Sequence, residues 1–258
     1  MFRDTFTITF GDQAENHVGM QKIGTPATSG LTLDELYTAQ RWFWSNGVDC
    51  TVYNIGLGCL SQEHLTKATP AYFLVARRGL DAILQSNQGS NAFYQEHAPL
   101  NKDTKVLMYG EVRNKQARWN LCFGDHPQEP DYANKKGRIV PFTQLPLLNY
   151  VRYRLPEIVG GKAYNLVAEA NYYYDPSKCG IGFHGDTERK IVVGLRLGQA
   201  MPLQFQWYER HKPVGERAHL VLDHGDVYMM SEKAVGSDWK CSSFLTLRHA
   251  AGAAKYLK

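Results

Sequence analysis

The chain has 258 residues, of which 43% are hydrophobic and 21% are charged, a balance that excludes a disordered polypeptide. No stretch approaches the roughly 18 to 20 apolar residues of a membrane-spanning helix, and the first residues lack the pattern of a signal peptide, so we expect no membrane association. Five widely spaced cysteines without a CxxC pair argue against a disulfide framework and favour a reducing compartment, either cytoplasmic or nuclear. The formal net charge is +4, and the segment 102–154 holds the excess, with ten basic and five acidic side chains.

The first part of the chain, residues 1–105, is predicted to be a mixed α/β region that flanks the core or is integral to it. Residues 5–10 alternate between threonine and apolar side chains and predict a strand that ends at Gly11. Residues 33–44 predict a helix, because Thr32 can cap its start and acidic side chains fill its first turn. Residues 72–85 predict a second helix.

The middle of the chain predicts a basic hairpin. Residues 106–112 and 119–123 are expected to be its strands, and residues 113–118 its amide-rich and basic tip. A short helix is expected over residues 145–154.

From Leu166 onward the sequence predicts many short strands with regular turns between them, which favours a sandwich or closed barrel over a parallel βαβ sheet. We therefore expect residues 106–258 to form the core of the molecule. The predicted strands cover residues 166–174, 181–184, 191–197, 203–208, 218–222, 227–230 and 244–247.

The tripeptide His184-Gly185-Asp186 sits at the end of one of these strands. Residues two apart on a strand point to the same side, so an imidazole and a carboxylate can reach one ion. Two histidines and one carboxylate on one side of Fe(II) leave the open positions that oxygen activation needs. A second such tripeptide, His224-Gly225-Asp226, most resembles a simple turn.

The surroundings of His184 make the chain resemble the AlkB-like family of Fe(II)- and 2-oxoglutarate-dependent dioxygenases over roughly residues 106–258. That family has an asparagine-tyrosine strand, an HxD motif, a strand ending near Phe-Gln, a Gly-Asp strand and an Leu-Thr-Phe-Arg-like strand, in this order. The matching segments here are Asn171–Tyr174, His184–Asp186, Ile191–Leu197, Pro202–Trp207, His224–Met230 and Leu245–Arg248. The resemblance implies an α+β fold with a double-stranded β-helix (jelly-roll) core flanked by N-terminal helices.

The resemblance also assigns residues by position. His184 and Asp186 match the first two iron ligands, and Asn171 and Tyr173 match the residues that hydrogen-bond 2-oxoglutarate. Arg248 matches the arginine that binds the carboxylate end of this co-substrate, which suits the planar fork of a guanidinium.

The third metal ligand departs from the family pattern, because Trp239 is followed by Lys240 and Cys241 where a histidine is expected. The next histidine, His249, directly follows Arg248, and neighbours on a regular strand face opposite sides. One alternative is that His249 completes the site and another cation, such as Arg196, helps to hold the co-substrate. The other is that Arg248 is the clamp and the third ligand is Cys241, His224 or absent.

The basic hairpin is similar in place and chemistry to the nucleotide-recognition hairpins of AlkB-like enzymes. Arg113, Lys115 and Arg118 are expected to contact phosphates, and Tyr109 or Trp119 to stack on an extruded base. The alternative is a structural hairpin with solvated charges. DNA or RNA is therefore the expected partner.

The implied reaction consumes 2-oxoglutarate and molecular oxygen and, through a ferryl intermediate, hydroxylates a C–H bond or demethylates a modified base. Two other functions stay open at this point. One is a protein or small-molecule hydroxylase on the same fold, and the other is a nucleic-acid-binding barrel without iron or catalysis.

Overall fold

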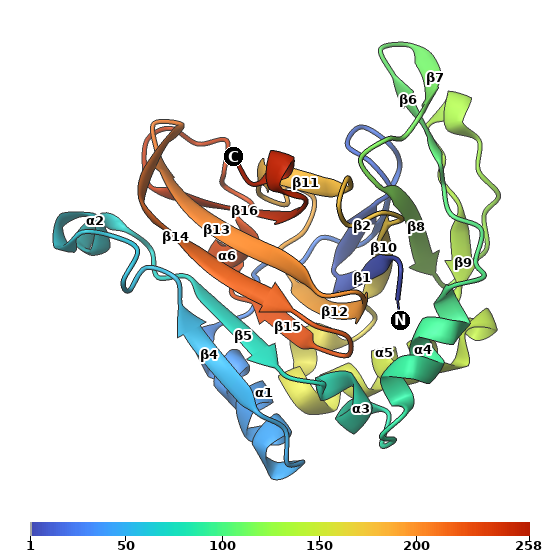
Figure 1. Ribbon diagram of the computed structural model, residues 1–258, viewed down its shortest axis with the longest axis horizontal. Coiled ribbons are helices and arrows are strands. Elements are labelled where there is room, and N and C mark those ends of the chain that lie inside the picture. The colour runs from blue at the N-terminus through green and yellow to red at the C-terminus, as the bar shows by residue number, and fades with distance from the viewer. Residues whose placement is uncertain (1) are drawn as a thin grey trace.

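A computed structural model describes residues 2–258 as a mixed α/β fold dominated by two β-sheets (Figure 1). The larger sheet has eight strands in the order β4-β5-β15-β12-β1-β10-β8-β9, antiparallel except between β8 and β9. Its strands are β1 (Thr5–Gly11), β4 (Cys50–Asn54), β5 (Tyr72–Ala76), β8 (Trp119–Gly124), β9 (Ile139–Pro141), β10 (Val167–Tyr173), β12 (Val192–Gly198) and β15 (Val227–Met230).

The smaller sheet faces the larger one and has four antiparallel strands in the order β11-β16-β13-β14. Its strands are β11 (Gly180–His184), β13 (Met201–Glu209), β14 (Lys212–Leu222) and β16 (Thr246–Gly252). Two separate hairpins complete the strands: β2 (Gln13–Glu15) with β3 (Lys22–Gly24), and β6 (Lys105–Met108) with β7 (Glu111–Asn114).

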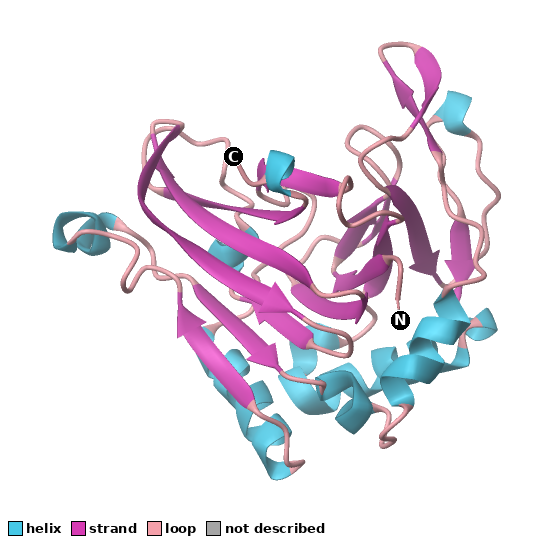
Figure 2. Cartoon of the chain, in the orientation of Figure 1, coloured by secondary structure: helices cyan, strands magenta, loops and turns pink. Residues whose placement is uncertain are grey.

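Most helices gather along one side of the larger sheet (Figure 2). The helices are α1 (Leu33–Ser45), α2 (Gln62–Lys67), α3 (Gly79–Ile83), α4 (Gly89–His97), α5 (Pro146–Val159) and α6 (Glu232–Val235), with short 3-10 turns at Tyr132–Asn134, Phe142–Gln144, Gly161–Ala163 and Ala254–Tyr256. The helical side is not purely N-terminal, because α5 comes from beyond residue 105. No helix among residues 2–258 is long and apolar enough to cross a membrane.

The first strand explains how the two sides of the larger sheet differ. In β1, Phe6, Ile8 and Phe10 pack into one apolar core with residues of α1, α4 and α5. The alternating threonines of the same strand point to the other side, toward the smaller sheet, where Thr7 and Thr9 line a cavity. This N-terminal strand pairs with both β10 and β12, so it lies in the middle of the sheet formed mainly by later segments.

Several predicted elements are confirmed. The strand at residues 5–10 is β1, and the helix expected over residues 33–44 is α1, whose Thr32 forms a reciprocal capping box with Glu35. The helix expected near residues 145–154 is α5, which continues to Val159.

Two predicted elements are wrong. Residues 72–85 form strand β5 and the short helix α3 instead of one helix, because the apolar run Tyr72–Ala76 pairs between β4 and β15. The basic hairpin turns at Tyr109-Gly110, where both residues have positive φ, rather than at residues 113–118. The predicted second strand, residues 119–123, belongs to β8 and pairs with β10.

Candidate metal centre and cavity

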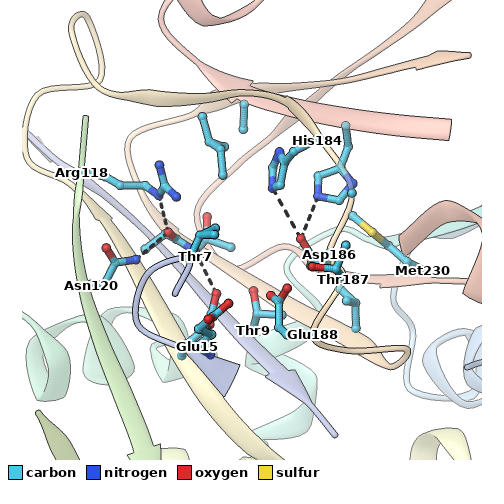
Figure 3. Close-up of a pocket in the computed structure, with 18 of the residues that line it drawn as sticks. Thr7, Thr9, Glu15, Arg118, Asn120, His184, Asp186, Thr187, Glu188 and Met230 are labelled. Atoms are coloured by element: carbon cyan, nitrogen blue, oxygen red, sulfur yellow. Dashed lines mark hydrogen bonds and ion pairs between the residues drawn. The ribbon is translucent and has the colours of Figure 1, made fainter. Parts of the chain in front are cut away.

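A cavity of about 180 Å³ lies between the two sheets. Its walls come from the inward-facing side chains of β1, β10, β12 and β15 on one side and from β11 and β16 on the other. The loop between β2 and β3 contributes Asn16, His17 and Val18. Figure 3 shows that the side chains reaching this space are mostly polar.

Three side chains with metal-ligating atoms converge in the cavity: His184, Asp186 and His249. His184 ends β11 and pairs directly with His249 of β16, so both imidazoles project from the same face of the smaller sheet. Asp186 Oδ1 lies 3.4 Å from His184 Nε2 and 3.6 Å from His249 Nε2 (Figure 3). The candidate ligand atoms all lie within 4.8 Å of one another, a spacing that one ion can bridge.

The backbone around this cluster orients its side chains. His184 Nδ1 lies 2.8 Å from the carbonyl oxygen of Gly182, and a proton donated there leaves Nε2 with a free lone pair toward Asp186. A Cβ atom at Gly185 would come within 1.9 Å of the Gly236 carbonyl oxygen, so only glycine allows this close approach.

Asp186 is half-buried within a group of charged side chains. Burial alone would raise the pKa of Asp186, but Arg189 and the two imidazoles outweigh it and hold this pKa well below its usual range. Arg189 is itself buried and contacts Glu169 at 2.7 Å, Glu188 at 2.6 Å and Asp186 at 3.5 Å. The Asp186 carboxylate is therefore charged. Arg189 contacts its Oδ2 atom, while its Oδ1 atom faces the two imidazoles.

Asn171 and Tyr173 also face this cavity, from two alternate positions of strand β10. Asn171 Oδ1 accepts hydrogen bonds from Arg118 Nε at 2.6 Å and from Asn120 Nδ2 at 2.9 Å (Figure 3). Tyr173 is 3% exposed and lines the same cavity. The structure thus brings both residues near the cluster, as the resemblance implies.

Arg196 of β12 is a buried cation in the same cavity. Its side chain is 1% exposed, and neither Nε nor Nη1 has a hydrogen-bond partner among the described residues. Burial lowers the pKa of Arg196, and the nearby Tyr228, Tyr173 and Asp226 oppose this only in part. Opposite it on β1, Thr7 Oγ1 is buried and also lacks a hydrogen-bond partner within the described part of the chain.

The alternative assignments for the third ligand and the clamp are not supported by position. Arg248 lies on the opposite face of β16, where its guanidinium stacks 3.8 Å from the Tyr208 ring, so it does not line the cavity. Cys241 lies beside Ser243 outside the cavity lining. His224 accepts a hydrogen bond from the Gly198 amide and stacks on Phe2, also outside it.

Of the five residues assigned to nucleic-acid contact, Arg113, Lys115 and Arg118 line a shared pocket beside the β6–β7 hairpin, whereas Tyr109 and Trp119 are not among its lining residues. Tyr109 is 87% exposed at the turn of the β6–β7 hairpin, and Arg113 on β7 pairs with Glu111. Lys115 is buried, with Nζ bonded to Asn16 and Asn120, so its ammonium group is engaged within the protein rather than presented to solvent. Arg118 points into the cavity rather than to solvent.

Trp119 is likewise in contact with neighbouring side chains. Its ring already stacks against those of Tyr172 and Tyr174, at centroid distances of 5.6 and 4.6 Å. Part of the indole surface is therefore already covered by these two tyrosines.

Sequence reasoning missed Arg189, Glu169 and the threonines of β1. Arg189 and Glu188 follow Asp186 within three residues, which is a local signal for a charged partner of a ligand. The contribution of β1 has no local signal, because its neighbours in the sheet are more than 150 residues away in the chain.

Comparison with known proteins gives a relative but no activity. No family model matches the chain. Over 256 residues, which cover 99% of this chain and 98% of the relative, the sequence is 46% identical to "Uncharacterized protein R156" of Acanthamoeba polyphaga mimivirus.

Proposed function

This chain belongs to the same family as the mimivirus protein, and we propose that it is an AlkB-like Fe(II)- and 2-oxoglutarate-dependent dioxygenase that hydroxylates or demethylates a modified base in nucleic acid. The observation that carries the proposal is the convergence of His184, Asp186 and His249 in a cavity that also contains the unpaired guanidinium of Arg196. Two imidazoles and one carboxylate leave three positions on an octahedral Fe(II) for a chelating co-substrate and oxygen.

The charges around Asp186 suit a divalent cation. Three buried or half-buried carboxylates, Asp186, Glu169 and Glu188, surround the single cation Arg189. Buried charge of one sign is costly unless it is compensated, so two further positive charges at this place would balance the group. The neutral Nε2 atoms of the histidines provide the nitrogen ligands that iron accepts.

The unpaired donors deeper in the cavity suit the far carboxylate of 2-oxoglutarate. Arg196 and Thr7 lie opposite each other on β12 and β1, and both carry buried polar atoms without partners among residues 2–258. A buried donor that stays unbonded costs free energy, and a carboxylate can accept from a guanidinium and a hydroxyl together. This pairing favours Arg196 over Arg248 as the co-substrate clamp.

The order of the strands supports a double-stranded β-helix as the finer description of the fold. Successive strands from β10 to β16 lie in both sheets: β10, β12 and β15 in the larger one, and β11, β13, β14 and β16 in the smaller one. Strand β1 lies between β10 and β12 in the larger sheet. Together with the seven strands just named it makes a core of eight strands, four in each sheet.

In this proposal the chain's own residues hold and orient the reactants. When bound, Fe(II) supplies, with 2-oxoglutarate and oxygen, the oxidising power needed to hydroxylate a C–H bond. Gly182 fixes the ring of His184 through its carbonyl group, and Arg189 fixes the carboxylate of Asp186. The side chains of Val192, Tyr228 and Met230 form a wall that limits the access of water.

Turnover of 2-oxoglutarate to succinate in the presence of Fe(II), ascorbate and methylated oligonucleotides tests this function. We expect turnover by the wild type and by His126→Ala, whose histidine is exposed far from the cluster, and none by His249→Ala. Oxidation of a peptide or small molecule in place of the oligonucleotides would indicate a hydroxylase of another substrate class. Oligonucleotide binding without any turnover by metal-loaded wild type would indicate a non-catalytic barrel and contradict the proposal.

A further inference from the structure

The outer face of the smaller sheet, which is turned away from the cavity, carries basic and aromatic side chains from all four strands. Phe183 comes from β11, Tyr208 from β13, Arg217 from β14 and Arg248 from β16. We call these four residues the outer sheet face. The pairing of Phe205 with His249 and of Gln206 with Arg248 places alternate residues on opposite faces, which separates this surface from the cluster.

The two arginines of the outer sheet face are held flat against aromatic rings. Arg248 lies 3.8 Å from the ring centroid of Tyr208, and Arg217 lies 5.0 Å from that of Phe183. Arg217 also bonds to Gln206 and to the Leu257 carbonyl group. Neither guanidinium forms an ion pair with a carboxylate within residues 2–258, so their charge is available to an anionic partner.

The adjoining turn adds to this positive surface. Arg210 and His211 connect β13 to β14, and both adopt left-handed backbone conformations, with φ of 49° and 66°. Such a turn favours asparagine and glycine, so an arginine and a histidine are strained there. His211 Nδ1 lies 3.3 Å from Arg248 Nη2, which joins the turn to the outer sheet face.

Acidic side chains of the same hairpin lie elsewhere. Glu209 approaches His64 of α2, and the Glu216 amide bonds to the Cys59 carbonyl group near that helix. The Glu209 carboxylate is thus directed toward α2, whereas Arg217 and Arg248 lie over the sheet. This separation gives the outer sheet face a net positive potential.

Trp239 connects this surface to the cavity. Its side chain lines the cavity, while Arg248 lies 5.0 Å and Lys240 lies 5.6 Å from its ring. A linear polymer that binds the outer sheet face and extends past Trp239 would reach the cavity that His184 lines.

We propose that the outer sheet face binds the sugar-phosphate backbone and bases of a single-stranded nucleic acid whose target base enters the cavity past Trp239. Guanidinium forks suit phosphate oxygens, and aromatic or guanidinium planes at a sheet surface suit unpaired bases. The surface thus defines a substrate class for the proposed dioxygenase, on which this inference rests.

The test measures the affinity of the full-length protein for labelled single-stranded DNA and RNA of about 12 nucleotides, in the absence of iron and 2-oxoglutarate. For the double variant Arg217→Gln with Arg248→Gln we expect at least a tenfold loss of affinity. We also expect a weaker salt dependence, with the slope of log K against log salt concentration smaller in magnitude by about two. Lys135→Gln with Lys136→Gln removes the same charge beside the β6–β7 hairpin and should leave affinity within about threefold. Tyr208→Leu, which keeps both charges, should weaken binding through loss of the stacking platform.

Two outcomes would overturn the inference. One is that the lysine pair matters and the arginine pair does not, with both variants folded by circular dichroism. The other is equal competition by a polyglutamate peptide, which would indicate an acidic protein partner. Because binding is measured without turnover, a failed binding test leaves 2-oxoglutarate consumption by the wild type as a separate result.

Discussion

Arg196 illustrates how a single residue can be unfavourable for folding and useful for binding. Its guanidinium is buried, and two of its nitrogen atoms have no hydrogen-bond partner among residues 2–258, which costs free energy in the absence of an anion. We therefore predict that Arg196→Met raises the Michaelis constant for 2-oxoglutarate by roughly 10- to 100-fold, the size of a lost charge-assisted hydrogen bond. The same change should leave the free energy of unfolding equal or higher.

Arg248→Met is the matched control for this prediction. Arg248 carries the same charge as Arg196 and is next to His249 in β16, but its side chain lies on the other face of the sheet. The Michaelis constant for 2-oxoglutarate should therefore not change. An unchanged constant in Arg196→Met, or a raised one only in Arg248→Met, would refute the assignment of the clamp.

Lys115 makes a second prediction at the residue scale, about pH. Burial lowers the pKa of Lys115 from 10.5 to about 8, and Asp103 only partly opposes this. Between pH 8 and 10.5 the unfolded chain therefore binds more protons at this residue than the folded chain, and the residue's contribution to stability rises with pH. Below pH 8 the buried ammonium is held by Asn16 and Asn120 at the full cost of its desolvation.

Urea unfolding at pH 7 and 9.5 measures this effect in the wild type and Lys115→Met. The wild type should gain about 1 to 2 kcal/mol relative to the variant on going to the higher pH. Other groups titrate in both proteins and cancel in the difference. Parallel stability curves for the two proteins would show that Lys115 is not desolvated as described.

At the scale of elements, helix α1 is stabilised by its capping box. Thr32 Oγ1 accepts a hydrogen bond from the Glu35 amide, and Glu35 Oε2 accepts one from the Thr32 amide at 2.8 Å. Thr32→Ala should lower the free energy of unfolding by about 1 kcal/mol because a donor at the helix start loses its partner. Thr38→Ala, an exposed position inside the same helix, is the control and should be close to neutral in thermal unfolding.

Local patterns explain why some elements were predictable. The threonine cap and acidic first turn predicted α1, and alternation predicted β1, because each signal lies within the element. Residues 72–85 were misread as a helix, because the apolar run there is buried by β15 rather than by a helical face. The hairpin turn was misplaced because Tyr109-Gly110 is a weaker signal than the polar run after it.

At the scale of the whole molecule, the site depends on pairing between distant segments. The HxD spacing predicted His184 and Asp186 from their strand, and His249 followed from being the next histidine in the chain. Only the register between β11 and β16 places His249 opposite His184 and turns Arg248 outward. No local sequence pattern predicts that β1 lies between β10 and β12, where it completes the cavity wall.

The most direct test of the central claim is a titration of the anaerobic, metal-free protein with Fe(II), with binding followed by calorimetry. The account predicts one ion per chain for the wild type and His126→Ala, and loss of that binding in Asp186→Ala and His249→Ala, with the fold intact by circular dichroism. Iron binding that persists in both cluster variants, or that never occurs in the folded wild type, would contradict it.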